Sequence, residues 1–360
     1  MDEGSLIHAG CKVVRNCPIN VAPVSCWVHH KPSALKQHMP SVLLARLREQ
    51  RRIYQSRFTL PHKRWLICRP RGGLNDTLCQ IHKSIVYSFR HQRIVLIDTT
   101  KAGLCDEFSN YFQTVFPFAT IHCSLEPGKL KELDERSCYP NGFQGRLGNY
   151  ELIYSPEAGN YIDTKSGQRP GISWNENDHS EEVMLNEQTG GGYGYLALPY
   201  FRFTNEASKH IVNRLSQIPN KYIAMIIRHS DVRLDYREFL KASKPLIDGQ
   251  DVLVSTDSHE ALTYARSYLD NARIYDVADV PDVQGQTLLN TPGVTSRKII
   301  LGCLTQLIGL SRAEKIMIPA GDNVYPSGFT QLAMSLSGRN DLIQQLLGEN
   351  MRTLNCSGDP

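Results

Sequence analysis

Short apolar runs alternate with segments of helical periodicity through the second half of the chain. Four of these runs are rich in Ile and Val and have the length of a buried strand. They lie at residues 222–227, 251–255, 273–277 and 315–318. Between them the apolar residues recur every three or four positions, which predicts helices beginning near residues 204, 235, 259, 295 and 327. This alternation is typical of a doubly wound α/β sheet with parallel strands.

The same alternation starts earlier, at residue 65. Residues 65–68 and 93–98 are predicted strands, and the helical periodicity between them begins at residue 77. The glycine-rich residues 190–194 predict a flexible turn or hinge. Residues 100–170 show only fragments, namely a helix around 108–112, a strand at 119–123 and loops at 140–149 and 164–174. We therefore expect a first α/β domain and a second one, with the boundary at 195–205.

The first sixty residues follow neither pattern. Residues 1–35 have scattered prolines and no sustained period. Residues 41–57 mix leucines with arginines at helical spacing and predict a basic amphipathic helix. Such a helix lies on an anionic membrane surface, or it packs its leucines on the neighbouring domain and solvates its arginines. The pair His29 and His30 is a weak metal-binding signal. Because adjacent residues on a strand face opposite ways, we place the pair in a solvated loop.

Composition narrows the class of protein. The chain has 360 residues, of which 41% are hydrophobic and 21% charged, as in a folded protein of two domains. A net charge of +4 gives no general signal for binding nucleic acid, so we expect no nucleic-acid partner. No apolar run approaches the roughly 20 residues of a membrane helix, and the acidic start at Met1 is unlike a signal peptide. We expect a cytoplasmic protein, and peripheral membrane contact through residues 41–57 stays one of the two alternatives for that helix.

The cysteines do not have the spacing of a metal site. There are ten, and none forms a Cys-x-x-Cys pair, so we expect no structural zinc. Without a signal peptide they are expected to be free thiols in a reducing compartment. Cys68 and Cys303 lie in apolar segments and are predicted core residues.

Polar side chains follow three predicted strands of the second half. Arg228 opens the first group, Asp257 stands in the second, and Ser327 begins the last helix. The carboxyl ends of parallel strands meet at one edge of a sheet, where open α/β sheets bind ligands. An arginine fork and the amides of a helix start can hold a diphosphate without a metal, and Asp257 can accept hydrogen bonds from a ribose or a base edge. The predicted donor-site residues are Arg228, His229, Ser230, Asp231, Asp257, Ser258, Ser327, Gly328, Phe329 and Thr330.

Arg228, Asp257 and Ser327 also have a purely structural interpretation. Arg228 would cap a strand end and pair with Asp231, as surface arginines often do. Asp257 and Ser327 would cap helices. Capping explains either of these two by itself, but it does not explain their combination with Arg228.

In the first half, the strand at 65–68 runs into a turn with two adjacent glycines. Gly72 and Gly73 allow the backbone to approach a ligand closely at the start of a helix. The turn does not match G-x-G-x-x-G, and it lacks the Lys-Ser/Thr of a P-loop. The structural alternative is a tight turn that needs a positive φ.

These segments, in this order, resemble the fucosyltransferase-like glycosyltransferases of the GT-B architecture. That superfamily includes bacterial nodulation and polysaccharide fucosyltransferases and the eukaryotic core and protein O-fucosyltransferases. The similar segments are RGGLNDTLCQI at 71–81, IIRHSD at 226–231, VSTDSHEA at 254–261 and PSGFTQLAMSL at 326–336. The chain departs from the family pattern at three positions. His229 stands in place of a second arginine, Ser258 in place of a second aspartate, and Ile226 in place of a histidine.

The resemblance implies two Rossmann-like domains that face each other across a cleft. It implies inverting transfer of fucose from GDP-fucose to an oligosaccharide or to a lipid-linked or protein-linked glycan, in surface polysaccharide or glycoconjugate synthesis. In this scheme Arg228 stabilises the leaving diphosphate, Gly72, Gly73 and Asn75 lie on the acceptor side, and Asp76 is the candidate base. The expected parts are an extension (1–60), an acceptor-side domain (61–203), a donor-side domain (204–347) and a tail (348–360).

The sequence contains no Asp-x-Asp triplet, so we predict no metal and no cofactor other than the nucleotide-sugar donor. Two other interpretations stay open. A nicotinamide-dependent dehydrogenase is also α/β, although the missing G-x-G-x-x-G counts against it. A non-catalytic sugar-nucleotide or glycan-binding protein would bind GDP and transfer no sugar.

Overall fold

The computed structural model describes residues 11–13, 25–30, 63–101, 103–118, 120–158, 160–175, 177–229, 235–279, 296–320, 326–351 and 354. The chain divides into two compact units. One comprises Met39–Thr204, and its described residues hold a five-stranded sheet. The other comprises Met1–His38 with Asn205–Pro360, and its described residues hold a six-stranded sheet. We refer to them as the five-stranded unit and the six-stranded unit.

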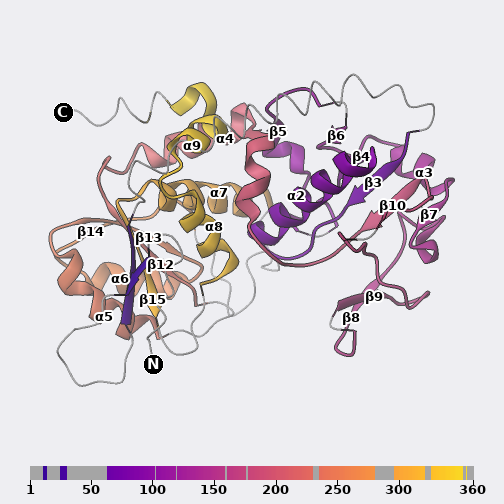
Figure 1. The fold of residues 1–360 in the computed structure, drawn as a ribbon. Helices are drawn as coiled ribbons and strands as arrows, with labels where there is room; N and C mark the ends of the chain where they lie inside the picture. The colour runs from indigo at the N-terminus through magenta and orange to yellow at the C-terminus, as the bar shows by residue number, and fades with distance from the viewer. Residues whose placement is uncertain are drawn as a thin grey trace, which may run out of the picture. The chain divides into compact units, whose positions relative to one another are not determined.

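The five-stranded sheet is wholly parallel. Its order is β6-β4-β3-β10-β7. The strands are β3 (Trp65–Cys68), β4 (Ile94–Ile97), β6 (Ile121–His122), β7 (Cys138–Tyr139) and β10 (Val183–Asn186). Every residue of β3, β4 and β10 is buried, as expected for parallel strands covered on both faces. Helix α2 (Leu74–His91) packs along β3 and β4, and it begins three residues before the predicted start (Figure 1).

Shorter elements complete this unit. They are η2 (Phe108–Asn110), β5 (Phe112–Thr114), α3 (Lys129–Asp134), η3 (Asn141–Phe143), β8 (Leu152–Ser155), β9 (Asn160–Asp163), η4 (Gly194–Tyr200) and β11 (Phe201–Phe203). The helix predicted around 108–112 is wrong. The chain makes a 3-10 turn and then a strand that pairs with β11. The spacing of Phe108 and Phe112 reflects stacking of their rings, 4.6 Å apart, rather than a helical face.

The six-stranded sheet has the order β1-β2-β15-β12-β13-β14. Its strands are β1 (Cys11–Val13), β2 (Ser25–His30), β12 (Ile223–Ile227), β13 (Asp251–Thr256), β14 (Arg273–Tyr275) and β15 (Lys315–Ala320). The last four are parallel, as predicted. The helices are α4 (Asn205–Leu215), α5 (Tyr236–Ile247), α6 (His259–Tyr268), α7 (Ser296–Arg312), α8 (Gly328–Leu336) and α9 (Asn340–Leu347), followed by η6 (Gly348–Asn350).

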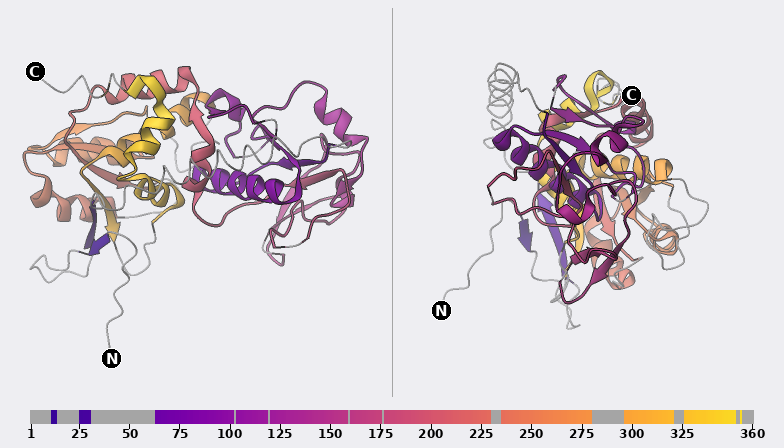
Figure 2. Two further views of the ribbon diagram at one scale, coloured as in Figure 1. Left: turned by 45° about the horizontal axis from the view of Figure 1, so that its top comes forward. Right: turned by 90° about the vertical axis from the view of Figure 1, so that its right-hand side faces the viewer.

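The N-terminal strands correct two predictions. β2 runs antiparallel to β15 and β1 antiparallel to β2, so the extension assigned to residues 1–60 supplies two strands to the sheet of the chain's second half (Figure 2). His29 and His30 therefore lie in a strand, paired with Ile316 and Lys315, and not in a loop. The error arose because these strands are short and show no sustained period. The amphipathic helix predicted at 41–57 lies outside the described residues.

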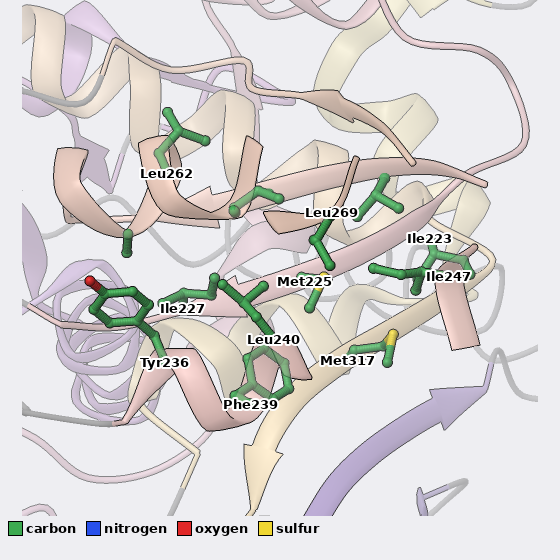
Figure 3. Packing of buried hydrophobic residues seen from close by; sticks show 14 residues of the cluster. Ile223, Met225, Ile227, Tyr236, Phe239, Leu240, Ile247, Leu262, Leu269 and Met317 are labelled. Carbon is green, nitrogen blue, oxygen red and sulfur yellow. The ribbon is translucent and has the colours of Figure 1, made fainter. Parts of the chain in front are cut away.

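The core of the six-stranded unit explains why β12 reads as an unbroken apolar run. Ile223, Met225 and Ile227 pack with α5 and α6 in one buried cluster around Phe239 (Figure 3). The opposite face of the sheet is covered by α7, where a Cβ on Gly309 would come within 2.8 Å of Leu253 on β13. Only glycine allows this close approach. Both faces of the strand are thus buried, and polar residues are confined to its ends.

The predicted tail also begins inside the six-stranded unit. Ser208 on α4 donates to the carbonyl oxygen of Leu347 (2.6 Å), and the amide of Asn350 donates to the Ser208 hydroxyl (3.1 Å). Leu354 is buried. Leu347 and Asn350 are therefore anchored on α4, and the domain continues beyond residue 347.

Candidate functional site

Arg228 and Asp257 leave neighbouring strands at the same level of the six-stranded sheet. The parallel register pairs Ile227 with Thr256, the last residues of β12 and β13. The backbone N–H of His229 donates to Asp257 Oδ1 at 2.7 Å. Both Arg228 and Asp257 are half-buried. The structure therefore brings together two strand ends that the sequence could only place on a common edge.

The turn after β12 is held from a second side. The His229 ring packs edge-on against Tyr236, with 4.8 Å between the ring centroids. The Tyr236 hydroxyl in turn donates to Glu260 on α6 at 2.6 Å. Two helices thus restrain the backbone that carries Arg228. Ser230 and Asp231 lie outside the described residues, so their predicted contacts stay predictions.

Two of the predicted site residues cap helices. Ser258 is the N-cap of α6 and accepts from the amide of Ala261 at 3.2 Å. Ser327 is the N-cap of α8 and accepts from the amide of Thr330 at 3.2 Å. The capping interpretation therefore holds for Ser327, whereas for Asp257 it is wrong, because the cap of α6 is the next residue, Ser258. The first amides of a helix have no intrahelical acceptor, so the N–H groups of Gly328 and Phe329 can still serve an anion at this helix start.

The sequence analysis did not find a charged network at the carboxyl edge of the five-stranded sheet. Arg69, Asp98 and Glu187 follow β3, β4 and β10 directly. The Arg69 guanidinium is fully buried, and its Nε donates to Asp98 Oδ2 at 2.7 Å. Its Nη1 donates to the Tyr150 hydroxyl at 2.8 Å, and Tyr150 donates to Glu187. Each charged residue directly follows an apolar run, which was the available signal, but residues 183–186 were not predicted as a strand.

Arg71 extends this network towards solvent. Its Nη2 lies 2.6 Å from Glu187 Oε1, and its guanidinium packs over the Tyr161 ring at 4.4 Å from the centroid. A quarter of the Arg71 side chain is exposed, whereas the Glu187 side chain is almost wholly buried. Arg71 is thus an oriented arginine with access to solvent, beside the glycine turn.

The glycine turn has a clear structural reason. Gly72 has φ +96°, and a Cβ there would lie 2.6 Å from Asp76 Oδ2. The tight-turn alternative therefore holds for Gly72. Gly73 caps α2 with an ordinary φ of −73°, and a Cβ there would meet nothing within 4 Å. The turn requires glycine at the first of the two positions only.

Asn75 and Asp76 differ in their surroundings. Asn75 is buried, with its Nδ2 donating to Gly192 O (3.2 Å) and its Oδ1 accepting from Gly194 N (3.1 Å). Its amide thus holds the glycine-rich loop at 190–194 against the start of α2. Asp76 is half-buried, and burial raises its pKa above the ordinary value in spite of the opposing effects of Asn75, Gly73 and Lys83. A carboxylate with a raised pKa is better matched to accepting a proton near neutral pH.

Three further predictions concern metal binding, membrane spans and thiols. Among the described residues, no group of three or more His, Cys, Asp or Glu side chains could hold a metal ion. None of the helices in the described ranges is both long enough and apolar enough to cross a membrane. The cysteines with described side chains are free thiols, namely Cys68, Cys79, Cys105, Cys123, Cys138 and Cys303. Cys68 is buried as predicted, whereas Cys303 is partly exposed.

No protein-family model matches the sequence, and no curated protein matches it. Solved structures do. The fucosyltransferase NodZ from Bradyrhizobium has a TM-score of 0.51 and 16% sequence identity, over 76% of this chain and 93% of that one. NodZ alpha-1,6-fucosyltransferase co-crystallised with GDP has a TM-score of 0.50 and 16% identity, over 76% of this chain and 92% of that one.

This likeness confirms the α/β class of the predicted fold. The chain has the α/β fold of a fucosyltransferase-like glycosyltransferase, with parallel sheets. At this identity the comparison concerns the fold alone. The arrangement of two domains across a cleft, and the roles of the individual site residues, stay predictions.

The buried pair of Arg69 and Asp98 gives a test of the network. Asp98→Asn would leave the buried Arg69 guanidinium without its counter-charge, and we expect the free energy of unfolding to fall by about 3–5 kcal/mol. Glu238→Gln, which breaks the exposed contact with Lys241, should cost no more than about 1 kcal/mol. Urea unfolding of the two variants measures both effects. Similar costs for the two would show that the Arg69 pair does not organise this edge.

The same pair has a defined pH dependence. Burial alone would raise the pKa of Asp98, but the Arg69 guanidinium and hydrogen bonds from Thr100 and Arg69 hold it below 3.8. Because the folded-state pKa is depressed, this stabilisation is fully present above pH 3.8 and is lost as the pH falls through the lower folded-state value. The difference in the free energy of unfolding between wild type and Asp98→Asn should therefore decrease as the pH falls below 3.8.

Proposed function

We propose that the chain is an inverting, metal-independent glycosyltransferase that moves fucose from GDP-fucose to a glycan acceptor in surface polysaccharide or glycoconjugate synthesis. The observation that carries the proposal is the joined pair of strand ends at Arg228 and Asp257, in a chain with the fold of NodZ. A structure of NodZ holds GDP. The same fold with an arginine at a parallel-sheet edge supports a nucleoside diphosphate as the ligand here.

The donor would bind the six-stranded unit. Arg228 offers a planar fork for two phosphate oxygens, and the start of α8 at Ser327 offers amide donors. One oxygen of Asp257 is held by the His229 backbone, which fixes its carboxylate near the end of β12. That orientation suits an acceptor of hydrogen bonds from a ribose or a base.

The reaction would be a single displacement at the anomeric carbon. The acceptor hydroxyl forms the new bond to that carbon while the bond to the GDP oxygen breaks on the opposite face, with oxocarbenium character in the transition state. Negative charge grows on the departing phosphate, where fixed donors such as Arg228 lower the barrier. Asp76 would take the proton of the acceptor hydroxyl, in keeping with the raised pKa of its carboxyl group.

The metal prediction has a direct test. Because the sequence has no Asp-x-Asp triplet, arginine and helix amides would supply the positive charge that a divalent cation supplies in other transferases. We expect transfer to proceed unchanged in EDTA. Loss of transfer in EDTA with recovery on addition of manganese would contradict this.

The Arg228 role predicts a specific kinetic defect. Arg228→Lys keeps the charge but loses the planar fork, so we expect a loss of about 2 kcal/mol in transition-state binding, roughly 30-fold in kcat/KM. Arg90→Lys replaces an exposed arginine at the end of α2 and should have no effect. Circular dichroism would establish that both variants are folded. A normal kcat/KM in the Arg228 variant would remove Arg228 from the site.

A second pair of variants tests the division of labour between the units. Asp76→Asn should leave GDP affinity intact and lower turnover, whereas Ser327→Ala should weaken GDP binding by about 1 kcal/mol, roughly fivefold. Glu126→Gln, an exposed carboxylate of the five-stranded unit, is the control. Calorimetry with GDP decides between the two halves. Loss of GDP binding in Asp76→Asn, with normal binding in Ser327→Ala, would reverse the assignment.

A further inference from the structure

A cavity of about 470 Å³ opens beside β7, the edge strand of the five-stranded sheet. Figure 1 shows this strand next to β10. The cavity is lined by Tyr139, Pro140, Asn141, Gln168, Arg169, Gly171 and Glu181. Its volume lies within the range of small-ligand sites, roughly 300–1,000 Å³. None of these residues belongs to the donor or acceptor residues predicted from the sequence.

The walls of this cavity are built by specific contacts. Gln168 Oε1 accepts from the backbone N–H of Gly142 at 2.9 Å, and Gln168 Nε2 donates to Asn141 Oδ1 at 2.8 Å. On another side, a Cβ on Gly171 would lie 2.3 Å from Gln188 Nε2, so the backbone of Gly171 packs directly on that side chain. The Tyr139 ring is stacked on His179, with 3.6 Å between the centroids. The site is therefore preformed rather than a gap between loops.

The charges on the lining balance. Arg169 is the cationic lining residue and Glu181 the anionic one. Arg169 uses Nη2 to reach Gln188 Oε1 at 2.6 Å, and its side chain is otherwise exposed. With two amides and an aromatic ring, the lining offers donors and acceptors in similar measure. This chemistry suits a neutral, polyhydroxylated ligand, because an anion would meet Glu181 and a cation would meet Arg169.

The cavity is connected to the charged network by one residue. The Gln188 side chain accepts from Arg169. The backbone carbonyl oxygen of Gln188 accepts from the backbone N–H of Arg71 at 2.8 Å. Gln188 also follows Glu187, the partner of Arg71. The cavity and the Arg71 turn therefore share one backbone segment at the carboxyl end of β10.

We propose that this cavity is a saccharide subsite that binds a neutral sugar unit of the acceptor, next to the glycine turn that carries Asp76. The assignment of this sugar unit to the acceptor rests on the proposed function. The chemistry of the ligand rests on the cavity lining alone. Glu181 accepts from sugar hydroxyls, Arg169 donates to them, and the Tyr139 ring bounds the space.

The test uses two changes that each remove one charge, with matched controls. Glu181→Gln and Arg169→Met remove one charged hydrogen-bonding group each from the cavity. Glu135→Gln and Arg90→Met change exposed residues of the same unit that do not line it. Full-length wild type and the four variants are applied to an array of neutral and acidic oligosaccharides, with GDP titrated separately. For any glycan that serves as a substrate, KM is measured for acceptor and for GDP-fucose.

The subsite predicts that wild type and the control variants bind neutral oligosaccharides. Both cavity variants should bind them about tenfold or more weakly, with unchanged affinity for GDP. A matching rise in acceptor KM would support the subsite as part of the transferase. If the protein transfers no fucose, the same binding pattern still supports the subsite while the proposed function fails. Three results would overturn the subsite. Wild type binds no sugar of the array, wild type binds acidic sugars alone, or both cavity variants bind neutral sugars as well as wild type does.

Discussion

Burial of parallel strands on both faces is the constraint on which both units depend. β3, β4 and β10 in one sheet, and β12 in the other, have no exposed residue, and none of them carries a charged side chain, because burying an unpaired charge is costly. Charged residues therefore appear where the strands end. Because parallel strands end at a common edge, charges far apart in sequence come into contact there.

The two edges use this arrangement differently. In the five-stranded unit, Arg69 and Asp98 are buried and neutralise each other. Tyr150 connects Arg69 to Glu187, and Glu187 pairs with Arg71, which is partly exposed. Removal of Asp98 would leave the buried Arg69 guanidinium without its counter-charge. In the six-stranded unit, Arg228 and Asp257 are both half-buried and lie near helix starts. The first edge is thus a network of largely buried charges, whereas the second carries half-buried charged residues at its strand ends.

The capping serines show how one residue serves structure and site together. Ser258 and Ser327 each accept from an amide in the first turn of their helix, which fixes where that helix begins. A helix start fixed in this way also fixes the direction of its remaining amides. The structural and functional interpretations of Ser327 are therefore compatible, because a stable cap is what would hold the amides of Gly328 and Phe329 ready for a phosphate.

Local pattern determined most of the elements, and tertiary pairing decided their neighbours. The strands β3, β4, β12, β13 and β15, the helices that follow them, and the polar residues at 228 and 257 could all be read from the sequence, because periodicity and strand-end polarity are local properties. Strand β10 is a short apolar run that was not predicted as a strand, so the network of Arg69, Asp98 and Glu187 was not assembled from the sequence. The placement of β2 beside β15 depends on contacts across nearly three hundred residues, for which a local period carries no information.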